Sequence, residues 1–228
     1  MSHSLDLFLG GAPEVGATRV ELKQLVIAGW TGRDPAAVEK HMRELELLGV
    51  RRPSAWPVFY RLAASRLSCE TVIEVTGSRS SGEVEAVLLQ CSGRLWLGVG
   101  SDHTDREVEA FDVTVSKQMC DKPVAPRFWS FEEVRGHWDS LILRSYIEEG
   151  GAVVAYQSGS AAEFLEPLDL IRRFTDSASL AEGTAMFCGT LAVKGQVRPS
   201  AQFTLELQDP TLNRTIRHQY RTAVLQAA

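Results

Sequence analysis

The sequence predicts an α+β fold in which a substantial sheet, or a β-roll, outweighs a few peripheral helices. Short segments rich in apolar and β-branched residues recur along the 228 residues, whereas few segments have the spacing of an amphipathic helix. Hydrophobic residues make up 44% of the chain and charged residues 23%, as in an ordinary globular protein. We therefore expect one compact unit with a sizeable core.

The N-terminal part alternates strands and one helix. Residues 5–9 and 24–28 are typical of short strands, and a helix is expected to begin after Asp34 and to end at Gly49. We expect residues 1–55 to form N-terminal strands and a lid-like helix, and residues 56–228 to form the core.

The expected helix carries a pair of polar residues that could do chemistry. His41 and Glu44 are three positions apart and are therefore neighbours on the helix surface. A carboxylate beside a histidine fixes its tautomer and raises its basicity, as a general base requires. An exposed His–Glu pair without a function has the same spacing, so this alternative stays open.

The rest of the chain continues the strand-rich pattern. We expect strands at residues 70–76, 107–118, 152–156, 182–191, 202–209 and 213–225, and helices at residues 130–149 and within 158–180.

An acidic hairpin lies at the centre of this pattern. Ser92-Gly93 is a plausible two-residue turn, because glycine adopts the backbone geometry that such turns require. With the turn centred there, residue 83 lies opposite residue 102. Directly opposed residues share a face, and so do residues two apart on a strand, so Glu83, Glu85 and Asp102 would project together.

Three facing carboxylates repel one another unless a cation or a proton lies between them. A divalent metal with oxygen ligands, such as Mg²⁺ or Mn²⁺, is the economical interpretation. Gly98 and Gly100 would leave room above this face, and the ammonium group of Lys117 could reach it. The alternatives are a hairpin with an acidic solvent face and a solvated lysine at a strand end.

Composition excludes several classes of function. The net charge of −5 argues against a nucleic-acid-binding surface. No apolar stretch reaches the roughly 20 residues that span a bilayer, and the N-terminus lacks the pattern of a signal peptide. The four cysteines are scattered without a CxxC pair, which argues against a zinc site or a disulfide framework. The cytoplasm is the expected location.

Taken together, these segments resemble the fumarylacetoacetate hydrolase superfamily over most of the chain. The resemblance covers an H-x-x-E helix, an E-x-E strand followed by an aspartate, a strand-borne lysine, a serine- and threonine-rich loop before a helix, and a final glycine-rich signature. The matching segments are His41-Met42-Arg43-Glu44, Glu83-Val84-Glu85, residues 101–106, Lys117, residues 158–171 and residues 180–191. The similarity implies a mixed β-sandwich or β-roll of this family's type.

The resemblance also implies a site and a reaction class. It implies a divalent metal (Mg²⁺ or Mn²⁺, with Ca²⁺ as an alternative), a small 2-oxo acid or 1,3-dicarbonyl acid as substrate, and a hydrolase or lyase reaction through an enolate. The implied residues are Glu83, Glu85 and Asp102 as metal ligands, His41, Glu44 and Lys117 as catalytic groups, and Arg106 and Thr190 as substrate contacts. A homodimer is expected by the same resemblance.

The sequence departs from the family pattern in four places. The segment between Glu85 and Asp102 is short, Gly183-Thr184 stands where the family has Gly-Asp, and Leu191 replaces a proline. The Asn-Tyr pair that the family has before the H-x-x-E segment is not recognisable. A catalytically degenerate protein of the same fold that only binds a metal or a ligand is therefore the alternative.

Overall fold

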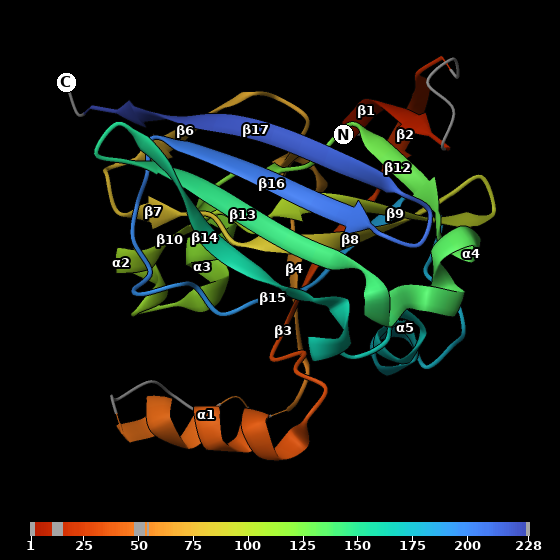
Figure 1. Ribbon diagram of the computed structural model, residues 1–228, viewed down its shortest axis with the longest axis horizontal. Helices are drawn as coiled ribbons and strands as arrows, with labels where there is room; N and C mark the ends of the chain where they lie inside the picture. The colour runs from red at the N-terminus through yellow and green to blue at the C-terminus, as the bar shows by residue number, and fades with distance from the viewer. Residues whose placement is uncertain (1–2, 11–15, 48–52, 54, 227–228) are drawn as a thin grey trace.

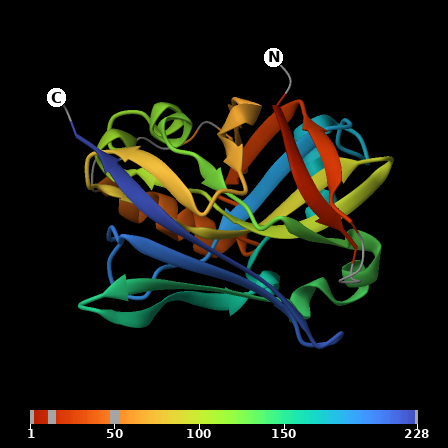
Figure 2. The ribbon, with the colours of Figure 1, turned by 90° about the horizontal axis from the view of Figure 1, so that it is seen from above.

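Two sheets form the body of the molecule, and the predicted α+β class with a dominant sheet is confirmed (Figure 1). The structure is a computed structural model that describes residues 3–10, 16–47, 53 and 55–226. Figure 2 shows the five-stranded sheet as a layer beneath the more strongly curved eight-stranded sheet.

The eight-stranded sheet brings together strands from distant parts of the chain. In spatial order its strands are β2 (Thr18–Leu22), β1 (His3–Leu9), β12 (Arg127–Ser130), β9 (Arg94–Ser101), β8 (Val84–Cys91), β15 (Thr184–Thr190), β3 (Gln24–Gly29) and β4 (Val58–Leu62). The expected boundary near residue 55 falls between β3 and β4, which are hydrogen-bonded neighbours in this sheet.

The second sheet has five strands and is built mostly from the later part of the chain. Its order is β14 (Ala152–Ser160), β13 (Ile142–Glu149), β16 (Gln202–Asp209), β17 (Arg214–Leu225) and β6 (Val72–Thr76). Two short pairs complete the strands, β10 (Thr104–Asp105) with β7 (Ser80–Ser81) and β11 (Lys122–Pro123) with β5 (Leu67–Ser68).

Strand β8 in the middle of the eight-stranded sheet is buried on both faces, which explains why it is apolar along nearly its whole length. One core lies between the two sheets and includes Val84 and Leu88 of β8 with Phe203 of β16. A second core lies inside the curve of the eight-stranded sheet and includes Val87 and Phe187. Alternate residues of β8 therefore point into different cores.

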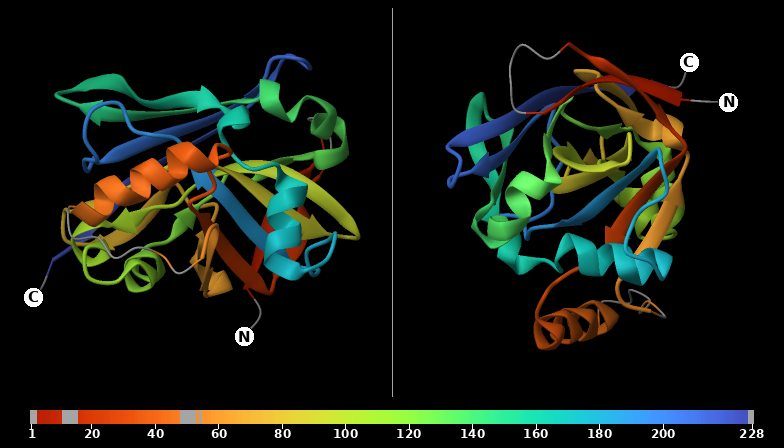
Figure 3. Two further views of the ribbon diagram at one scale, coloured as in Figure 1. Left: turned by 90° about the horizontal axis from the view of Figure 1, so that it is seen from below. Right: turned by 90° about the vertical axis from the view of Figure 1, so that its right-hand side faces the viewer.

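The helices are short and peripheral. They are α1 (Pro35–Leu47), α2 (Arg106–Glu109), α3 (Val113–Met119), α4 (Phe131–Val134) and α5 (Pro167–Thr175), with 3₁₀ turns η1 (Ala64–Arg66), η2 (Arg135–Ser140) and η3 (Ala161–Glu163). Helix α1 lies outside the two-sheet body, as the right-hand view of Figure 3 shows. None of the helices in the described ranges is long and apolar enough to cross a membrane.

Two sequence-based predictions of secondary structure are wrong. Residues 107–118 are helical, in α2 and α3, because Asp105 and Asp112 accept hydrogen bonds from the first backbone N–H groups of these helices. The expected helix at residues 130–149 contains only α4 and η2. From Ile142 the chain is strand β13, whose alternate buried residues include Leu143 and Ile147.

The predicted register of the acidic hairpin is confirmed. Glu85 pairs with Gly100, and the N–H of Asp102 donates to the carbonyl of Glu83 at 3.0 Å. Ser92 and Gly93 both have positive φ, as a two-residue hairpin turn requires.

The room expected above the hairpin glycines is occupied. A Cβ atom on Gly98 would lie 2.6 Å from the ring of Phe128, and one on Gly100 would lie 2.8 Å from the ring of Phe187. The two glycines therefore serve close packing of aromatic rings, and the predicted space above them is absent.

Candidate metal centre

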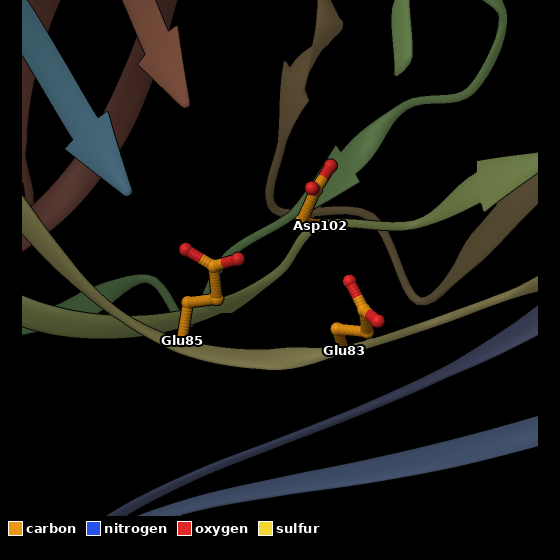
Figure 4. Close-up of side chains that lie close together, drawn as sticks. All are labelled: Glu83, Glu85 and Asp102. Atoms are coloured by element: carbon orange, nitrogen blue, oxygen red, sulfur yellow. The ribbon is translucent and has the colours of Figure 1, made fainter. Parts of the chain in front are cut away.

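Three carboxylates meet at the end of the strand pair β8–β9. One oxygen from each of Glu83, Glu85 and Asp102 lies within 4.8 Å of the other two. Figure 4 shows the three side chains facing a common space, with the blue strands of the five-stranded sheet on the opposite side of β8. The side chain of Glu83 is 17% exposed, whereas Glu85 and Asp102 are almost fully buried.

Asp102 is held by two ammonium groups. Lys117, in the last turn of α3, donates from Nζ to Asp102 Oδ2. Lys122 Nζ lies 3.1 Å from Asp102 Oδ1 and also donates to the carbonyl of His103. Both lysines are buried, so these charges are paired in a dry environment.

A third positive group approaches the cluster from α2. Arg106 is the first residue of this helix, directly after its capping residue Asp105. Its guanidinium lies 3.1 Å from Glu83 Oε1 and donates to Glu109 Oε2 at 2.7 Å. Arg106 also donates from Nε to the hydroxyl of Ser81 at 2.7 Å. It therefore closes the exposed side of the cluster next to Glu83.

An irregularity in β15 supplies a partner for Glu85. The pairing of β15 with β8 shifts between Phe187 and Thr190, and Gly189 within this bulge has a φ of +102°. The Gly189 N–H consequently donates to Glu85 Oε2 at 2.7 Å. β-bulges often re-aim groups beside functional sites in this way.

Burial and like charge act most strongly on Glu85. Burial, followed by the negative charge of Asp102, raises the pKa of Glu85 well above its usual value. For Asp102 burial works in the same direction, but Lys117 and Lys122 outweigh it and hold the pKa of this carboxyl below its usual value. Glu85 is therefore the member of the cluster that most needs a further cation or a proton.

The donor set suits a hard divalent cation. All three candidate ligands are carboxylates, and such oxygens are what Mg²⁺, Mn²⁺ and Ca²⁺ prefer. Each carboxylate has about four lone-pair sites, so the contacts with lysine, arginine and Gly189 leave acceptor capacity on every ligand residue.

Thr190 lies beside the cluster, but its hydroxyl is used within the protein. It donates to the carbonyl of Val84 at 3.0 Å and accepts from Gln157 Nε2 at 2.8 Å. Val84 stands between Glu83 and Glu85, so Thr190 contacts the backbone that carries two of the carboxylates. The expectation of a substrate contact for Thr190 stays a prediction.

His41 and Glu44 lie on α1, but their side chains fall outside the described residues. Their role as catalytic groups stays a prediction based on the H-x-x-E resemblance.

The structure adds two residues that sequence reasoning missed. Lys122 lies in the two-residue strand β11, where no periodicity shows which way its side chain points. Gln157 reaches the cluster region from β14, 73 residues after its partner Val84. Neither residue belongs to a local motif, and only tertiary structure brings the two side chains to this region.

Comparison with known families gives a match over most of the chain. A family model described as "Protein of unknown function (DUF2848)" covers residues 28–220. None of the curated proteins matches the sequence.

Solved structures share the fold at low sequence identity. A 2-keto-3-deoxy-D-arabinonate dehydratase complexed with magnesium and 2,5-dioxopentanoate is 14% identical, with a TM-score of 0.64 over 94% of this chain and 79% of the other. A yeast fumarylacetoacetate hydrolase family protein is 14% identical, with a TM-score of 0.63 over 91% and 95%. The fumarylacetoacetate hydrolase from Exiguobacterium antarcticum is 15% identical, with a TM-score of 0.58 over 94% and 85%. The resemblance inferred from the motifs is confirmed as a shared fold.

Proposed function

The chain belongs to the DUF2848 family, and from this premise we propose that it is a metal-dependent hydrolase or lyase acting on a small 2-oxo acid or 1,3-dicarbonyl acid. The observation that carries the proposal is the buried cluster of Glu83, Glu85 and Asp102 with Lys117 on Asp102. Such a convergence of buried like charges is costly and is typical of a site built for a ligand. The dehydratase that shares the fold was solved with magnesium and an oxo acid, which supports the same substrate class.

The three carboxylates would hold the cation. When bound, a divalent ion would supply Lewis acidity that polarises the carbonyl oxygens of an oxo acid and favours an enolate. The Lys117 ammonium would add positive charge where the negative charge of the substrate develops. Burial opposes the charge of this lysine, but Asp102, Glu83 and Glu109 keep its pKa above the ordinary value, so it acts as a fixed cation.

Arg106 is the proposed contact for the carboxylate of the substrate. Its side chain is 19% exposed and lies beside Glu83, at the side where the cluster approaches solvent. Its terminal nitrogens already contact Glu83 and Glu109, so it would act on the substrate carboxylate as a fixed positive charge beside these contacts. On α1, His41 oriented by Glu44 would activate water or move a proton.

One observation favours a second candidate, a degenerate protein in which the cluster is purely structural. Lys117, Lys122 and Arg106 already contact the carboxylates, so the chain carries its own counter-charges. In that case the departures in the last family signature would mark a site that has lost its reaction.

Calorimetric titration of metal-stripped protein with Mg²⁺ and Mn²⁺ distinguishes the two candidates. We expect binding by the unchanged protein and a loss of affinity of at least about a hundredfold in Glu83→Gln, Glu85→Gln and Asp102→Asn, because each removes a direct ligand. Oxalate and pyruvate should then raise the melting temperature only when the metal is present.

The matched control is Glu132→Gln, which removes an exposed carboxylate paired with Arg135. This variant should bind the metal as the unchanged protein does. Absence of metal binding by the unchanged protein would overturn the enzymatic proposal and leave the structural cluster as the better account.

A further inference from the structure

The strands that carry the three carboxylates are contacted from behind by side chains of the five-stranded sheet. Gln157 on β14 reaches β8, and Tyr220 on β17 reaches β9. Both are fully buried, with an exposed fraction of 0%. Neither touches the carboxylates themselves, so any effect on the cluster must pass through the backbone.

Gln157 holds the residue between the two glutamates. Since Asp102 and Glu83 form a hydrogen-bonded pair, Val84 directs its N–H and carbonyl away from β9, toward β15. The bulge of β15 leaves these two groups without strand partners there. Gln157 Oε1 accepts from the Val84 N–H at 2.9 Å, and the Thr190 hydroxyl donates to the Val84 carbonyl.

The amide of Gln157 is fully used. Its oxygen also accepts from the hydroxyl of Ser145 at 2.8 Å, and its nitrogen donates to Thr190 Oγ1 and to the carbonyl of Leu191. An amide has two donor and two acceptor positions, and all four are filled. The side chain therefore links β8, β13, β14 and the end of β15 at a single orientation.

Tyr220 holds the residues on either side of Asp102. Its hydroxyl shares hydrogen bonds with Ser101 Oγ at 2.8 Å and with His103 Nδ1 at 2.9 Å. On an extended segment these neighbours project opposite to Asp102, so fixing them turns Asp102 toward the cluster. A Cβ atom on Gly82 would lie 2.1 Å from the same hydroxyl, so the tyrosine also occupies the space beside the start of β8.

We propose that Gln157 and Tyr220 are positioning residues that set the separation of Glu83 and Glu85 from Asp102. Gln157 fixes the strand that bears the two glutamates, and Tyr220 fixes the strand that bears the aspartate. The significance of this role for a reaction rests on the proposed function, but the backbone restraint can be measured without any ligand.

The test compares Tyr220→Phe and Gln157→Leu with Tyr156→Phe. Tyr156 is an equally buried tyrosine whose hydroxyl accepts from the Arg198 N–H at 3.2 Å, away from β8 and β9. Amide hydrogen exchange is measured on the metal-free proteins, and Mn²⁺ affinity is measured by calorimetry.

The exchange rates are corrected for any change in global stability. We then expect the Asp102 amide to exchange about tenfold faster in Tyr220→Phe. The Val84 amide should exchange faster by about the same factor in Gln157→Leu. Mn²⁺ affinity should fall by about the same factor, and Tyr156→Phe should change neither local quantity. An equal local effect in Tyr156→Phe, or no local effect in Tyr220→Phe, would overturn the inference. Absence of Mn²⁺ binding by the unchanged protein would instead overturn the proposed function, while exchange would still decide the positioning role.

Discussion

On one side of the strand pair β8–β9 lie the carboxylates of Glu83, Glu85 and Asp102, and on the other side Gln157 and Tyr220 contact the same strands. Both regions are polar and buried. The side-chain amide of Gln157 has four hydrogen bonds to neutral partners, so its polarity is satisfied within the protein. The carboxylate side contains repelling charges, one of which has a raised pKa because of burial.

This difference indicates how the protein can keep an electrostatically costly site. A satisfied neutral network rigidifies the backbone, because each buried group lost from it would be left without a partner. The charged cluster adds little to the free energy of unfolding, because buried charges lose their hydration. The neutral network of Gln157 and Tyr220 therefore stabilises the backbone geometry that brings the three carboxylates together.

Loss of the neutral network should give the largest effect on stability. Gln157→Leu keeps the side chain's bulk but leaves Val84, Ser145 and Leu191 with an unsatisfied buried group each. We expect the free energy of unfolding to fall by about 3 kcal/mol, measured by urea denaturation. In Gln208→Leu, which removes a partly buried amide bonded to Arg144, the loss should stay below about 1 kcal/mol. Equal losses in the two variants would show that the hydrogen bonds of Gln157 stabilise the protein no more than those of a partly buried amide.

A substitution at Gly189 should have an intermediate effect, because this residue donates to Glu85 and directly precedes Thr190, a partner of Gln157. Gly189→Ala places a side chain at a φ of +102°, where its Cβ would lie 1.7 Å from Thr31 Oγ1. We expect the free energy of unfolding to fall by about 2 kcal/mol, because the strained backbone must shift. The Gly189 N–H would then leave Glu85, and metal affinity should fall as well.

The control for that variant is Gly10→Ala. Gly10 has a similar φ of +118°, but among the described residues no atom lies within 4 Å of an added Cβ. It therefore reports backbone strain without a clash, and it should leave metal affinity unchanged. A loss of affinity in Gly10→Ala would show that strain anywhere in the sheet reaches the carboxylates.

A change on the charged side should give the smallest effect, with the opposite sign. Glu85→Gln removes a buried charge but keeps an oxygen that can accept from the Gly189 N–H. In the metal-free protein, the free energy of unfolding should rise by about 1 kcal/mol, because repulsion from Asp102 is relieved. Urea denaturation with a chelator present measures this. A decrease of similar size would mean that the protein's own cations pair Glu85, as the structural-cluster candidate requires.

The acidic hairpin could be predicted from the sequence because its geometry is local. Ser92-Gly93 sets the turn, the turn sets the register, and the register decides that Glu85 lies opposite Gly100. The long apolar strands of the sheet were recognisable for the same reason. Their burial on both faces leaves a continuous apolar pattern that needs no knowledge of distant partners.

The surroundings of the carboxylates depend on contacts that sequence patterns do not report. Residues 107–118 alternate like a strand, but the capping residues Asp105 and Asp112 make them helical and so decide how Lys117 approaches Asp102. Lys122 and Gln157 had no local signal, since only tertiary structure brings them to this region.

The order of these residues along the chain has a consequence for biosynthesis. Gln157 follows Val84 by 73 residues, and Tyr220 follows His103 by 117 residues. A nascent polypeptide that has just formed the hairpin therefore bears its acidic residues without the side chains that hold them in place. Closing such long loops comes late in folding. We therefore expect the three carboxylates to reach their final arrangement only after the second sheet has docked, so partly synthesised chains emerging from the ribosome would lack it.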